Sequence, residues 1–163
     1  MSKELNKYID IEERKFCIQK FSAREGLKTA RLIIAKLLPI FETFILPAQV
    51  AQLKDGEIDI KNIGEFLNVD NIIKALELIS DQDLDTLIDR SLTNCYEALP
   101  AGNAKVLNEN GTYGVEGIEY DYILTLRLVA ESLIWSVGGF FDADRLTSLM
   151  GGIKGMDSLL PNA

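Results

Sequence analysis

The stretch QKFSAREGLKTARLIIAKLLPIFETFILP, residues 19–47, decides how the N-terminal part of the chain folds. Apolar side chains recur along it at helical spacing: Leu27, Ala30, Ile34, Leu37, Phe41 and Phe44. Arg24, Lys28 and Arg31 line the opposite side, so the spacing predicts an amphipathic helix with one basic edge. Pro39 cannot donate a backbone hydrogen bond and crowds the carbonyl four residues back, so we expect it to kink or split this helix.

The residues before this helix alternate between short apolar and polar positions. Over residues 8–21 this alternation, interrupted by a charged centre, is typical of a β-hairpin with Phe16 and Ile18 on one face. Ser22 and Glu25 then have the spacing of a capping box, in which the serine accepts a backbone hydrogen bond and the glutamate reaches back. A hairpin should therefore lead directly into the helix.

The strongest helical pattern is YDYILTLRLVAESLIWSV, residues 120–137. One face carries an apolar set: Ile123, Leu126, Ala130, Leu133, Ile134 and Val137. Leu124, Leu128 and Trp135 extend this face. The length approaches that of a membrane span, but Arg127 and Glu131 lie mid-segment at the spacing of a surface salt bridge and make insertion costly. We therefore reject a membrane span and expect this helix to pack against the helix of residues 23–38.

The middle of the chain is less regular. Short helices are predicted over residues 71–79 and from Ser80 to about Leu92, and the turn-rich residues 93–117 predict a small irregular β element. The expected fold is mainly α, with α+β character as a minor feature: a helical domain with an N-terminal β-hairpin and a small irregular β element between helices. We expect one domain over residues 1–150 and a flexible tail over residues 151–163.

Composition argues against catalysis and against nucleic acid. The chain has no histidine, which removes the commonest general base and zinc ligand, and its two cysteines have no metal-binding spacing. The acidic run at 81–85 resembles the start of a calcium loop, but Thr86 and Leu92 stand where glycine and glutamate are required. We therefore expect no catalytic residue, cofactor or metal. The net charge of −8 opposes binding to phosphate backbones.

Both long helices carry more apolar surface than one packed face requires. Core burial is the simpler interpretation of any single residue, but for the set we favour contact with other copies of the chain or with a helical client. The predicted partner-binding residues are Leu37, Phe41, Phe44, Trp135, Phe140 and Phe141.

The order of these segments resembles that of the tail assembly chaperones of long-tailed bacteriophages and prophages. The resemblance rests on a hairpin followed by FSAREGLKTARLIIAKLLPIF (21–41), LIDRSLTNCYEA (87–98) and LIWSVGGFFDADRL (133–146), and it covers roughly residues 14–145. Its best-matching points are Ala23–Gly26 and the aromatic pair Phe140 and Phe141. Relatives often carry an asparagine just before the closing aromatics, where this chain has Ser136–Gly139.

The resemblance implies a protein that coats the tape measure protein in the host cytoplasm before the tail tube polymerises. It also implies a short form and a frameshifted longer form that recruits the major tail tube protein, self-association, and neither enzymatic activity nor a cofactor. Three alternatives stay open: a virion structural tail-completion or connector subunit, an enzyme with an unfamiliar carboxylate site, and a small acidic adaptor or inhibitor.

Overall fold

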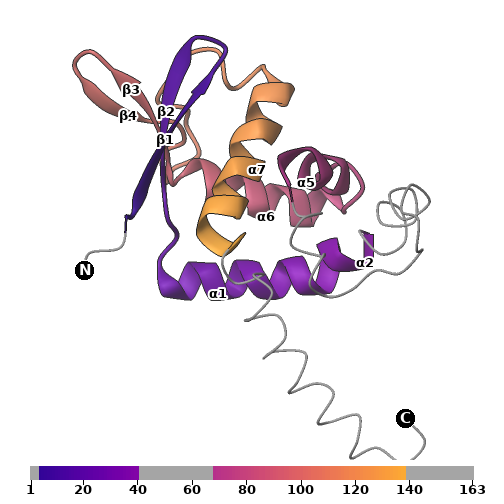
Figure 1. Ribbon diagram of the computed structural model, residues 1–163. Coiled ribbons are helices and arrows are strands. Elements are labelled where there is room, and N and C mark those ends of the chain that lie inside the picture. The colour runs from indigo at the N-terminus through magenta and orange to yellow at the C-terminus, as the bar shows by residue number, and fades with distance from the viewer. Residues whose placement is uncertain (1–3, 41–67, 139–163) are drawn as a thin grey trace, which may run out of the picture.

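The computed structural model describes residues 4–40 and 68–138, which form an antiparallel sheet packed against helices (Figure 1). In chain order the elements are β1 (Asn6–Ile11), β2 (Arg14–Gln19), α1 (Ala23–Leu32), the π-helical turn η1 (Ile33–Leu37), α2 (Leu38–Ile40), α5 (Val69–Leu76), α6 (Asp81–Leu92), β3 (Cys95–Leu99), β4 (Gly102–Lys105) and α7 (Tyr122–Val137). The predicted tail over residues 151–163 lies outside the described residues.

The expected mainly α fold is wrong, because the described residues form an α+β fold. Helices account for 51% of them and a four-stranded antiparallel sheet for 21%. The two β elements expected from the sequence form one sheet in the order β1-β2-β3-β4. Strand β2 pairs with β3, which puts Phe16 opposite Glu97 and Ile18 opposite Cys95. The alternation of apolar and polar residues locates the individual strands. It does not show that two distant hairpins pair in one sheet, because that pairing depends on how the strands are buried against the helices.

The N-terminal hairpin is confirmed, with β1 and β2 joined by Glu12 and Glu13. Both turn residues have positive φ, 50° and 69°, which is the backbone that a two-residue hairpin turn needs to match the strand twist. Phe16 and Ile18 have no exposed surface, as expected for the face turned toward the helices. The hairpin is therefore held in register by burial of one face.

Helix α1 begins at the predicted cap. The Ser22 Oγ accepts a hydrogen bond from the Glu25 backbone N–H at 3.2 Å. Pro39 was expected to kink or split this helix. In the structure the turn before Pro39 is a wider π-helical turn, in which the Leu38 N–H donates to the Ile33 carbonyl, five residues back. Such a π-turn accommodates the proline ring without ending the helix.

Helix α7 runs across the molecule and contacts α6, α5, β2 and α1, which confirms the expected packing against the N-terminal helix (Figure 1). Asp121 caps it by accepting from the Leu124 N–H at 3.0 Å. The predicted face is confirmed at Ala130, Leu133 and Val137, and Leu124 and Leu128, which were expected to extend it, are buried as well. The prediction is wrong at Ile123, which is 60% exposed. In the part of the chain that the structure describes, no helix is long and apolar enough to span a bilayer.

The core lies between the inner face of the sheet and the helices. It is made of fully buried side chains from every layer: Phe16, Ile18, Ile33, Leu76, Leu87, Leu92, Val106, Ile118, Leu128 and Leu133. The segment after β4 closes one end of the core, where an isolated bridge joins Leu107 to Tyr113. At Gly114 the backbone approaches β4 so closely that a Cβ would clash with the Lys105 carbonyl oxygen.

Replacement of Gly114 by alanine should therefore destabilise the fold. We expect Gly114→Ala to lower the free energy of unfolding by about 1–3 kcal/mol, because the backbone of β4 or of the following segment must move. The free energy of unfolding is measured by urea denaturation, with circular dichroism as the signal. Gly26→Ala is the matched control: its nearest outside neighbour would be the Phe21 Cβ at 4.0 Å, so the helix should gain about 1 kcal/mol. Equal effects at the two glycines would contradict the close approach.

Candidate partner-binding site

The predicted partner-binding residues fall into three groups. Phe41, Phe44, Phe140 and Phe141 lie outside the described residues. Leu37 has no exposed surface and belongs to the core. Trp135 is half-buried at the surface of α7. A role of these six residues in binding a partner stays a prediction.

Trp135 links the last helix to the start of the sheet. Its indole Nε1 donates to the Leu5 carbonyl at 3.2 Å. The Lys20 ammonium lies 4.5 Å from the centre of the ring and that of Lys7 lies 5.8 Å from it. Both lysines are placed for cation–π contact with the electron-rich face of the indole. Trp135 therefore has a structural role: it holds the N-terminal segment against α7.

Glu131 extends this cluster along α7. The side chains of Arg127 and Glu131 form the predicted i,i+4 ion pair, with 3.2 Å between Nε and Oε1. Lys7 from β1 approaches the same carboxylate at 3.8 Å. Because Glu131 is 8% exposed, these cations compensate a carboxylate that is largely removed from water.

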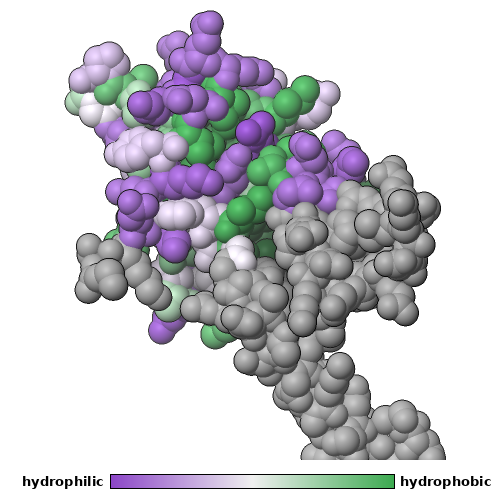
Figure 2. Space-filling view, in the orientation of Figure 1, coloured by the Kyte–Doolittle hydropathy of each residue, from purple (hydrophilic) through white to green (hydrophobic). Residues whose placement is uncertain are grey.

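Several large apolar side chains are exposed on the described helices. Leu27 on α1 is 65% exposed, and Ile34, seven residues later on η1, is 38% exposed. At the start of α7, Tyr120, Tyr122 and Ile123 are 88%, 72% and 60% exposed. Figure 2 shows hydrophobic residues running between hydrophilic ones along the face where α7 lies. The sequence analysis placed Ile123 on a buried face and so missed this exposed group. The two tyrosines before the aliphatic stretch were a usable signal, because tyrosine is enriched at protein interfaces.

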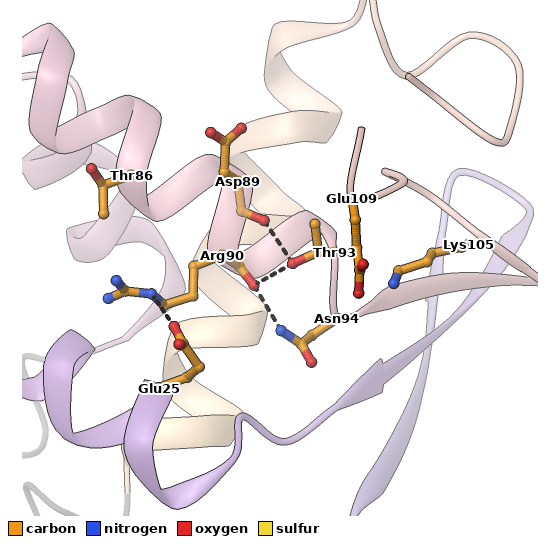
Figure 3. Close-up of a pocket in the computed structure, with 8 residues that line it drawn as sticks. All are labelled: Glu25, Thr86, Asp89, Arg90, Thr93, Asn94, Lys105 and Glu109. Carbon is orange, nitrogen blue, oxygen red and sulfur yellow. Dashed lines mark hydrogen bonds and ion pairs between the residues drawn. The ribbon is translucent and has the colours of Figure 1, made fainter. Parts of the chain in front are cut away.

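A second candidate is an open polar groove between α1, α6 and the end of β4, with a volume of about 510 Å³ (Figure 3). Its lining residues are Glu25, Thr86, Asp89, Arg90, Thr93, Asn94, Lys105 and Glu109. Arg90 already bonds within the fold, to the Glu25 carboxylate at 2.8 Å and to the Thr29 hydroxyl at 2.9 Å. The arrangement joins α6 to α1 and mixes charges of both signs, so it selects no class of ligand.

The two cysteines are both buried, and the described residues form no group that could hold a metal ion. Burial raises the pKa of the Cys95 thiol to about 12, which removes the thiolate needed for nucleophilic attack at neutral pH. Cys17 is also buried. Within residues 4–40 and 68–138, no group of three or more His, Cys, Asp or Glu side chains is placed to hold a metal ion.

A bidentate polar contact lies where β2 meets β3. Arg14 donates two hydrogen bonds of 2.8 Å to the two oxygens of Glu97, and a third of 3.0 Å to the Glu116 carbonyl. The hydrogen bond from Arg14 lowers the pKa of the Glu97 carboxyl, despite the opposing effect of burial. This bidentate pair ties the hairpin both to β3 and to the segment that precedes α7.

Comparison with known proteins identifies the class. Residues 12–150 match the model of a family described as phage tail assembly chaperone protein, TAC. The match covers most of the chain, so this protein belongs to the phage tail assembly chaperone family, and the resemblance seen in the sequence is confirmed. No curated protein and no solved structure matches the chain.

The Arg14–Glu97 pair predicts a pH-dependent stability. At pH 7 we expect Glu97→Gln to lower the free energy of unfolding by about 1–3 kcal/mol, because a charged hydrogen bond at a mostly buried site is lost. The pKa of Glu97 is lower in the folded chain than in the unfolded chain, so this stabilisation is fully present when the pH is above the pKa of the unfolded chain. The stabilisation is lost as the pH falls through the pKa of the folded chain.

Chemical denaturation of both proteins between pH 7 and pH 3 measures this difference. The two stabilities should converge in acid, where Glu97 is protonated. Glu77→Gln is the control, since Glu77 is exposed at the end of α5. A pH-independent gap between the Glu97→Gln variant and the original chain would contradict the assignment.

Proposed function

We propose that this protein binds the tape measure protein during tail assembly and keeps it soluble. The observation that carries the proposal is the match of residues 12–150 to the phage tail assembly chaperone family. We further propose that it self-associates, acts in the host cytoplasm without enzymatic activity or a cofactor, and reaches the major tail tube protein through a frameshifted longer form.

The surface of the described residues supports a client-binding role. The exposed apolar groups on α1 and η1 and at the start of α7 suit contact with apolar faces of client helices. The net charge of −8 would keep a coated client from associating with itself. Many copies on one long client bind by avidity, so each contact can be weak and still be displaced when the tube polymerises.

Co-expression with a phage tape measure protein from the same genome tests the proposal. We expect a tagged chain to retain the tape measure protein in the soluble fraction, in many copies per client as measured by light scattering. The purified phage particle should lack the chain. A chain that leaves the client insoluble and is found in particles would contradict the proposal and favour a tail-completion or connector subunit.

Surface variants test which residues touch the client. Replacing Tyr122 and Ile123 together by serine should weaken client binding per copy by about tenfold, because both side chains are exposed apolar anchors. The matched control is Leu99→Ser, since Leu99 is 44% exposed at the tip of the β3–β4 hairpin, far from the start of α7 (Figure 1). Single alanine variants of the predicted residues belong in the same assay: Phe41, Phe44, Trp135, Phe140 and Phe141. Equal losses for the double variant and the control would show that α7 is not the contact surface.

A further inference from the structure

The sheet has two edges, and they differ. Strand β4 is four residues long, and the segment at Gly114 lies against its Lys105 carbonyl. Strand β1 is six residues long and regular, with neither a proline nor a bulge. Among the described residues, only β2 pairs with β1. An edge strand of this length with a free side is a template for another strand.

The hairpin geometry shows which backbone groups of β1 are free. Because a two-residue turn joins the strands, Ile11 and Arg14 exchange backbone hydrogen bonds, and bonded pairs then recur at every second residue. The Lys20 N–H donating to the Leu5 carbonyl at 2.8 Å continues this series. The N–H and C=O groups of the residues between, Asn6, Tyr8 and Asp10, therefore point away from the sheet.

We propose that β1 pairs antiparallel with β1 of a second copy, about a two-fold axis at Tyr8, to make one continuous sheet across a dimer. This inference deepens the self-association in the proposed function and rests on it for its biological role. Three residue pairs would exchange backbone hydrogen bonds: Asn6 with the partner's Asp10, Tyr8 with the partner's Tyr8, and Asp10 with the partner's Asn6. Tyr8, 55% exposed in the single chain, would lie against its symmetry mate.

The side chains of β1 favour a second copy of this chain as the occupant. About Tyr8, each Asp10 carboxylate faces an Asn6 amide, which can donate to it. A pairing centred on Lys7 would place two lysines together, and one centred on Asp10 would place two carboxylates together. A pairing centred on Ile9 retains fewer bonded pairs. The strand is thus self-complementary in the Tyr8-centred register.

Lys7 would normally discourage such pairing, since an inward-facing charge on an edge strand opposes the approach of another strand. Here its ammonium is already engaged, 3.8 Å from the Glu131 carboxylate and 5.8 Å from the centre of the Trp135 ring. Its charge is therefore compensated within its own chain, which leaves the edge available.

Disulfide trapping tests the register on the full chain. Across the proposed axis the two Tyr8 Cα atoms would lie at about the 5.5 Å of a hydrogen-bonded antiparallel pair, which a disulfide can span. Tyr8→Cys is made in a Cys17→Ala background, because Cys17 is the β2 partner of Tyr8 and would compete. We expect Tyr8→Cys to oxidise to a covalent dimer. Asp10→Cys in the same background should stay monomeric on denaturing gels. A cross-link at Asp10 and not at Tyr8, or at neither, would overturn the proposal.

Charge variants at Asn6 give effects of opposite sign. Asn6→Asp should weaken the dimer by repelling the partner's Asp10, and Asn6→Lys should tighten it. Each should change the dimer dissociation constant by about twofold to thirtyfold, measured by sedimentation over a concentration series without the client.

Tyr8→Pro removes a backbone N–H that points away from the sheet and makes no hydrogen bond to β2. This variant should be a monomer that is folded by circular dichroism. A chain that is monomeric at all concentrations, or an oligomer that none of these variants changes, would overturn the edge pairing.

The client assay is separate from these measurements. A Tyr8→Pro monomer that still retains the tape measure protein would leave the proposed function standing. A Tyr8-linked dimer that does not retain the client would support the edge pairing and contradict the client-binding role.

Discussion

The pairing of β2 with β3 is the contact on which the rest of the structure depends. It joins residues 14–19 to residues 95–99, and so closes the chain between its first hairpin and the segment that follows α6. Phe16 and Ile18 on β2 and Cys95 on β3 then form one buried face, onto which α7 packs. Without that pairing, two isolated hairpins would each have to be stable alone, which two-stranded hairpins in water are not.

A few polar contacts between distant segments define how the helices meet this sheet. Arg14 bridges β3 and the segment before α7, and Arg90 holds α6 to α1 through Glu25 and Thr29. At the other end, the Phe21 N–H donates to the Ser136 hydroxyl at 3.1 Å, beside the contact of Trp135 with Leu5. Each contact joins residues far apart in the chain, and each satisfies polar groups that the packing removes from water.

In this fold, the surfaces that form the core are distinct from those that remain exposed to solvent. The inner face of the sheet and the buried side of α7 are filled by core side chains, while exposed apolar groups include Leu27 on α1, Ile34 on η1 and Ile123 at the first turn of α7. The outer side of β1 offers backbone groups in place of side chains. The described part of the chain thus presents two kinds of surface: exposed apolar side chains on helices, and backbone groups at the outer edge of β1.

The sequence by itself determined the local elements. Period-2 alternation located the first hairpin, Ser22 and Ser80 marked two helix starts, and apolar spacing located α7, because each depends on residues within one or two turns of each other. The order of these segments was also enough to indicate the family. Only the tertiary structure decided that two hairpins join into one sheet, that Ile123 on α7 is exposed, and which residues pair with Arg14 and Arg90. These features depend on contacts between residues that are tens of positions apart in the chain. The packing of the whole domain decides which face of an element is buried, and no local pattern of residues contains that information.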